Sequence, residues 1–78
     1  MNTKETKLDV IERIEGQLDL HDTFNAIYEA NYCLEYELIF RDEFALELEK
    51  ATDQLKEDDD VLIFAMKLRV LRQDIEAQ

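Results

Sequence analysis

Apolar residues recur at helical spacing along most of the chain. Between residues 4 and 20 they fall three or four positions apart, with charged residues on the other side, which is the pattern of an amphipathic helix. The same spacing recurs over residues 23–40, 42–56 and 60–77, and we predict helices over all four ranges. The core expected from them comprises Leu8, Ile11, Ile14, Leu18, Phe24, Ile27, Leu34, Leu38, Leu48, Leu55, Leu62, Ala65, Leu68 and Leu71.

The middle of this pattern leaves two alternatives open. Residues 32–40 are apolar at every even position, which is also a β-strand pattern, but no turn signal flanks the segment and an isolated strand would have no pairing partner. Near Asp42 the chain either turns or continues as one helix over about 23–56, which would run about 51 Å. We therefore predict an all-α bundle of three or four helices, forming a single domain over residues 1–78.

Turn residues are scarce, because the chain has no proline and a single glycine, Gly16. Sheet-rich domains depend on such residues, whereas helices can be joined by short polar loops. Gly16 lies inside the first predicted helix, where it costs about 1 kcal/mol relative to alanine. We expect either the close approach of a neighbouring helix at Gly16 or a weak helix end. The acidic run over residues 57–60 is the clearest loop.

The residue inventory excludes several kinds of chemistry. The chain has no serine, one cysteine (Cys33) and one histidine (His21), which rules out a serine triad, an internal disulfide and a four-ligand Cys/His zinc site. A single glycine excludes a phosphate-binding loop, and residues 57–60 lack the ligand pattern of an EF-hand. We expect no catalysis, cofactor or metal, an inert buried thiol at Cys33 and a solvated His21. A carboxylate-rich, metal-dependent enzyme is the least favoured alternative.

Location and partner class follow from hydropathy and charge. The longest apolar run has six residues, Val61–Met66, far short of the roughly 20 that cross a bilayer. The first residues lack a signal-peptide pattern, and a lone cysteine suits a reducing compartment, so we predict a cytoplasmic protein. A formal net charge of −11 repels nucleic acid and anionic membranes. The partner predicted by charge is a basic protein surface.

The acids are unevenly distributed. Between Ile14 and Glu49 ten acids face one base, Arg41. Several acids recur three or four residues apart, a spacing that places like charges on one helix face and opposes helix formation by a few tenths of a kcal/mol per pair. We predict an acidic partner-binding face, with solvation alone as the alternative explanation of the charge. The face comprises Glu15, Asp19, Asp22, Glu35, Glu43, Glu47, Glu49, Asp53 and Glu57.

The segment over residues 24–40 carries more apolar residues than one helix face can hold. A helix packed on one side hides a stripe a little over 100° wide, so a second neighbour must cover the remainder. A symmetric homodimer is a common solution. The residues expected to mediate self-association are Tyr28, Tyr32, Tyr36, Ile39 and Phe40.

In size, acidity and helical content the chain resembles, in general style, small phage or mobile-element proteins that inhibit host nucleic-acid enzymes, such as anti-restriction and anti-CRISPR proteins. The resemblance covers no motif and assigns no residue role. It implies a DNA mimic that docks onto a nucleic-acid-binding protein. Bacteriocin immunity proteins and adaptor subunits share the style. The expected function is a non-catalytic interaction module, an inhibitor or adaptor, with a structural or regulatory homodimer as the alternative.

Overall fold

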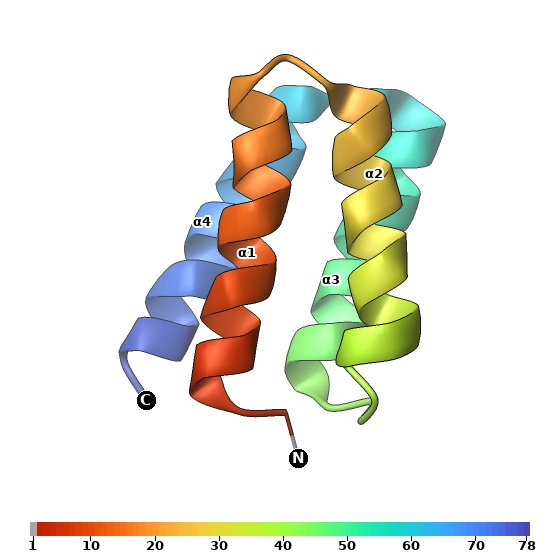
Figure 1. The fold of residues 1–78 in the computed structure, drawn as a ribbon. Helices are drawn as coiled ribbons and strands as arrows, with labels where there is room; N and C mark the ends of the chain where they lie inside the picture. Colours follow the sequence, from red (N-terminus) through yellow and green to blue (C-terminus); the bar gives the residue numbers. More distant parts are fainter. Residues whose placement is uncertain (1) are drawn as a thin grey trace.

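Residues 2–78 are described by a computed structural model, and Met1, the first residue of the expected domain, lies outside them. Within that range the chain forms a helical bundle without strands (Figure 1). Its helices are α1 (Lys4–Asp19), α2 (Thr23–Tyr32), α3 (Glu43–Asp58) and α4 (Val61–Glu76). A π-helical turn, η1 (Cys33–Glu37), continues α2. The prediction of a small all-α bundle is confirmed, and the strand alternative for residues 32–40 is wrong.

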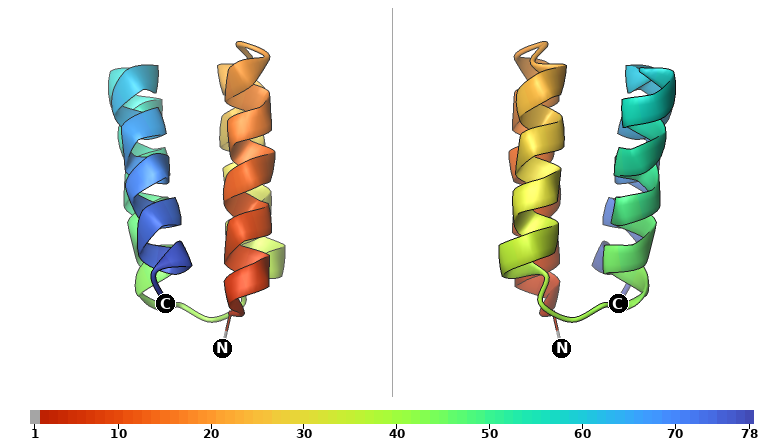
Figure 2. Two further views of the ribbon diagram at one scale, coloured as in Figure 1. Left: turned by 90° about the vertical axis from the view of Figure 1, so that its left-hand side faces the viewer. Right: turned by 90° about the vertical axis from the view of Figure 1, so that its right-hand side faces the viewer.

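The helices run alternately up and down. Each helix packs against the next one in the chain, and α4 returns to pack against α1. Figure 2 shows the result as two hairpins side by side, α1–α2 and α3–α4, with both ends of the chain at the same end of the bundle. This is the arrangement expected when antiparallel helices are joined by short loops.

Every helix begins at a capping side chain. The side-chain oxygen at each N-cap accepts a hydrogen bond from the backbone N–H three residues later, which satisfies one of the donors that a helix start leaves free. The caps are Thr3, Asp22, Asp42 and Asp60. Asp60, the last acid of the run over residues 57–60, therefore starts α4, whereas Glu57 and Asp58, which were expected in the loop, belong to α3.

The continuous middle helix over 23–56 is wrong, because the chain leaves the helix at Leu38. The N–H of Leu38 closes the π turn on the carbonyl of Cys33 at 2.6 Å, and Leu38 itself takes a non-helical backbone conformation. Its side chain is buried. Asp42 then caps α3 through the N–H of Ala45. This break lets Phe44 and Leu48 of α3 return to the core instead of extending into solvent.

The expected core is largely confirmed and fails at two positions. Phe24 and Leu62 are 79% and 78% exposed. Along α2 and η1 the most buried positions are taken by small side chains, Ala26, Ala30 and Cys33, and Phe24 is left outside. Of the two alternatives at Gly16, the close approach of a neighbouring helix is wrong, because a Cβ added there would have nothing within 4 Å.

Candidate interaction surface

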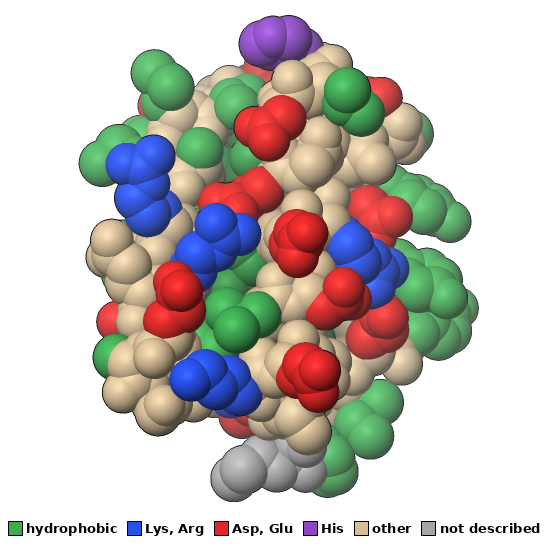
Figure 3. Space-filling model, turned by 60° about the vertical axis from the view of Figure 1, so that its left-hand side comes forward, with side chains coloured by type: hydrophobic (Ala, Val, Ile, Leu, Met, Phe, Trp, Pro, Cys, Tyr) green, Lys and Arg blue, Asp and Glu red, His purple; other side chains and the backbone are tan. Residues whose placement is uncertain are grey.

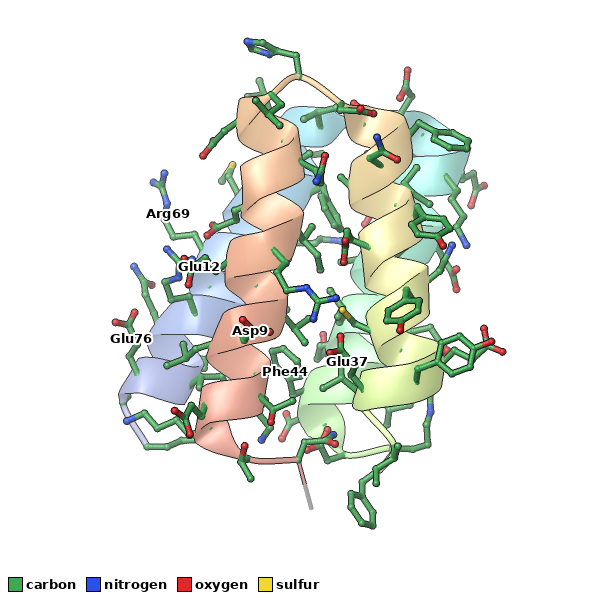
Figure 4. The ribbon with its side chains drawn as sticks, viewed as in Figure 1. Asp9, Glu12, Glu37, Phe44, Arg69 and Glu76 are labelled. Atoms are coloured by element: carbon green, nitrogen blue, oxygen red, sulfur yellow. The ribbon has the colours of Figure 1, made fainter. Side chains whose placement is uncertain are left out.

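Four aromatic residues form an exposed row along α2 and η1, which we call the aromatic stripe. They are Phe24, Tyr28, Tyr32 and Tyr36, spaced four residues apart, and their exposed fractions range from 42% to 79%. In Figure 4 aromatic rings project outward from α2 along its whole length. Large apolar side chains exposed in a contiguous row are unusual on a folded domain and mark contact surfaces.

The π turn helps to keep this stripe in line. Residues four apart in an α-helix advance 40° around the axis per step, because each residue turns 100°. A π turn is wider, so each residue in η1 turns less and the drift between Tyr32 and Tyr36 is reduced. The two rings lie with centroids 5.0 Å apart and planes tilted by 49°. They form one continuous aromatic surface.

All five residues predicted for self-association are exposed. Ile39 and Phe40 follow the stripe in the break between η1 and α3, and both leave about half or more of their surface in solvent. Phe24 was expected in the core and instead begins the stripe. The sequence signal for this was the row of small residues, Ala26 and Ala30 with Cys33, which falls at helical spacing opposite the aromatic residues.

The nine predicted acidic residues do not lie on one face. Glu15 and Asp19 line the groove between α1 and α4. A second group, Glu35 with Glu49 and Asp53, lies between α2 and α3. A third group, Glu43 and Glu47, lies between α3 and α4. The two remaining acids stand apart: Asp22 is the N-cap of α2, and Glu57 lies near the end of α3.

Several of these acids are paired with bases. Glu15 pairs with Arg72 across α1 and α4, and Glu49 lies 2.6 Å from Arg41. Asp53 and Glu47 have looser partners within their own helix, 3.9 and 3.6 Å away. Figure 3 shows acidic and basic side chains interleaved over the side formed by α1 and α4. The helical spacing used to predict the acidic face gave no sign of the Glu15 pair, because Arg72 lies 57 residues further along the chain.

A row of acids on the outer surface of α1 was only partly predicted, since Asp19 was among the predicted site residues and the other three were not. Glu5, Asp9, Glu12 and Asp19 are all exposed, and Figure 4 labels Asp9 and Glu12 along this helix. We call them the α1 acidic row. Only Asp9 forms an ion pair within residues 2–78. The signal was available in the sequence, since these acids alternate with the apolar stripe of the first predicted helix.

One ion-pair cluster ties α1 to α2. Arg13 donates to Glu29 at 3.0 Å and to Glu37 at 2.8 and 2.5 Å, while the thiol of Cys33 donates to Glu37 at 3.0 Å. Burial, reinforced by Glu37, raises the pKa of Cys33 to about 12. The nucleophile is the thiolate, so this thiol is in its unreactive form at neutral pH. His21 is exposed in the loop after α1, far from this cluster in sequence.

A second apolar surface lies on α4 and was not predicted. Leu62, Met66 and Val70 point away from the core and are mostly exposed. Met66 and Val70, together with Ile63, line an open groove of about 610 Å³ between α3 and α4. The side chain of Lys67 reaches across this groove to Gln54.

Residues 2–78 contain no group of three or more His, Cys, Asp or Glu side chains arranged to hold a metal ion. In the same range no helix is both long and apolar enough to cross a lipid bilayer. Comparison with protein families, characterised proteins and solved structures finds no match to this chain.

Proposed function

We propose that this protein is a non-catalytic interaction module, an inhibitor or adaptor, that contacts a partner protein through the aromatic stripe. The observation that supports this is the exposure of Phe24, Tyr28, Tyr32 and Tyr36 on a bundle with a continuous buried core. Tyrosine is enriched at protein interfaces because its ring is apolar while its hydroxyl can remain hydrogen-bonded. A cytoplasmic location belongs to the proposal, supported by a single buried free thiol.

The stripe is large enough to supply useful binding energy. At roughly 200 Å² per aromatic side chain, the exposed fractions of the four residues amount to about 500 Å². Removing that area from water contributes about 12 kcal/mol before the entropy cost of association is subtracted. That cost is of the same order, so the stripe favours reversible binding over a permanent complex.

Affinity capture with matched variants tests the proposal. Wild type, Tyr28→Ser, Tyr32→Ser and the control Leu62→Ser would each be immobilised and exposed to lysate from the source cell. Leu62 is more exposed than any of the three tyrosines of the stripe but lies on α4. We expect wild type and Leu62→Ser to retain the same partner and the tyrosine variants to lose it. Equal capture by all four proteins would eliminate the stripe as the contact surface.

A second candidate function is docking of the α1 acidic row onto a basic protein surface. It is favoured by four exposed acids on one helix, three of them without an ion-pair partner in residues 2–78. Neighbouring members of the row lie about 5 to 10 Å apart along the axis, a spacing that could imitate backbone phosphates. This retains the DNA-mimic hypothesis, with the α1 acidic row, of which only Asp19 was predicted, in place of the nine-residue acidic face.

Charge neutralisation separates this candidate from the first. Replacing Glu5, Glu12 and Asp19 together with Gln, Gln and Asn removes three charges from exposed positions. Steered docking onto a basic surface then weakens, and binding by wild type falls as salt rises, because screening shortens the range of the charges. If binding responds neither to the charge neutralisation nor to the salt concentration, the acids of this row serve solvation alone.

A further inference from the structure

The spacing of the aromatic stripe identifies a specific partner. We infer that two copies of this chain pair through their stripes, antiparallel, about a two-fold axis that passes between Tyr28 and Tyr32. This inference rests on the proposed role of the stripe as a contact surface. It adds that the protein which covers the stripe is a second copy of the same chain.

Helix-packing geometry supports self-pairing. Side chains four residues apart form a ridge on a helix surface, and the commonest packing of two helices places such a ridge of each into the groove beside the ridge of the other, with axes crossing at about −50°. Phe24, Tyr28, Tyr32 and Tyr36 form a ridge of this type. Two copies therefore carry the same ridge and the same flanking grooves, which a two-fold interface requires.

The regular spacing makes the stripe the same length in both directions from its centre. Antiparallel pairing about the midpoint of Tyr28 and Tyr32 sets Tyr28 of one copy beside Tyr32 of the other. The ends of the ridge, Phe24 and Tyr36, then face each other across the axis. No residue of the ridge is left without an aromatic counterpart, and offset aromatic pairs add stability beyond the area that they bury.

Charge selects the antiparallel arrangement over the parallel one. Glu35 is the only acid of η1 that is both exposed and without an ion pair in residues 2–78. In a parallel pair the two Glu35 side chains would lie at the same level of the contact, whereas in the antiparallel pair they lie at its opposite ends. There each Glu35 lies level with Asn25 of the other copy, and Asn25 is exposed and neutral.

The size of the contact predicts a weak, reversible dimer. Two stripes together offer about 1,000 Å² of side-chain surface, at the lower limit of specific interfaces. Each copy also carries a net charge of −11, so the copies repel each other at long range. Because salt screens that repulsion, added salt should strengthen this dimer. Docking onto a basic partner would respond in the opposite direction.

The chain provides its own reporter for the test. It has three tyrosines and no tryptophan, and all three tyrosines belong to the stripe. Sedimentation velocity and iodide quenching of tyrosine emission would be followed from low to several hundred micromolar protein, at low and moderate salt. We expect a monomer–dimer equilibrium that shifts toward dimer with salt, accompanied by a loss of quenching. Tyr28→Ser and Tyr32→Ser should each weaken the dimer about tenfold or more, and Leu62→Ser should not.

Three outcomes would overturn the inference. In the first, wild type sediments as a monomer at every concentration. In the second, it forms a dimer that Leu62→Ser abolishes, and in the third, it forms a dimer that the tyrosine variants leave unchanged. If wild type is monomeric while partner capture still depends on Tyr28 and Tyr32, the second copy is excluded and the proposed function stands. If neither association depends on these tyrosines, both proposals fail. Circular dichroism of each variant confirms that the fold is retained.

Discussion

Replacing Gly16 with alanine should stabilise the bundle. Gly16 lies in α1 with ordinary helical backbone, since no glycine has a positive φ, and a Cβ at this position would meet nothing within 4 Å. Alanine then removes a propensity cost of about 1 kcal/mol for a glycine in a helix interior. Because α1 ends three residues later, at Asp19, where helices fray, we expect a gain of about 0.5 to 1 kcal/mol.

Thermal unfolding followed by circular dichroism measures this gain. For a domain of this size it corresponds to a rise in Tm of about 2 to 8 °C. Gly16→Val is a matched control, since it adds a Cβ in the same space but loses side-chain freedom in a helix, and its gain should be at most about half as large. An unchanged or lower Tm for Gly16→Ala, with an unchanged denaturant m-value, would refute the reasoning about open space at this position.

Three further predictions concern helix ends. Asp59→Gly should raise the free energy of unfolding, measured by urea denaturation, by about 1 kcal/mol. Asp59 has a left-handed backbone with φ of 53°, a conformation that costs a non-glycine residue about 1 kcal/mol. No gain would mean that the Asp59 side chain offsets this cost. Asp22→Ala should lower the free energy of unfolding by about 1 kcal/mol, because it removes the cap of α2. Asp19→Asn removes an acid from the C-terminal end of α1, where negative charge is unfavourable, and should be neutral or slightly stabilising. Equal losses of stability in the two variants would contradict this distinction. Burial opposes the ionisation of Asp42, but the Ala45 N–H and the nearby Lys7 outweigh it and lower the pKa of Asp42, so its contribution is present above the unfolded pKa of about 4 and is lost as pH falls below it. Urea titrations should therefore show a smaller acid-induced loss of stability for Asp42→Asn than for wild type, and parallel pH profiles would count against this role.

Helix starts were predictable because their determinants are local. Thr3, Asp22 and Asp60 stand immediately before apolar-periodic runs, and capping depends only on the next three residues. The outcome near Asp42 was less certain, because a helix continuing through it and a helix beginning at it have the same local pattern. The π turn over residues 33–37 had no recognised local signal.

The orientation of α2 could not be derived from hydrophobicity alone. Large apolar residues cover more than half of its circumference, and the usual rule places the largest ones inside. The structure instead buries Ala26 and Ala30, and it leaves Phe24 in solvent. Which face turns inward depends on how closely α1 and α3 approach, and that is a property of the assembled bundle. The partner of Glu15 was equally inaccessible, since sequence spacing relates charges only within one helix.

The order in which the helices are joined affects how the chain folds. Of the four most extensively packed helix pairs in residues 2–78, three are consecutive in sequence, and the fourth, α1–α4, joins the first and last helices of the bundle. Topologies dominated by local contacts fold in microseconds to milliseconds. The α1–α4 contact requires the longest loop to close, so it should form late, after the hairpins. Removing the Arg72 side chain that links α4 to Glu15 would then mainly accelerate unfolding and leave the folding rate almost unchanged. We therefore expect the lifetime of the native state to be more sensitive to changes at the α1–α4 contact than to changes within either hairpin.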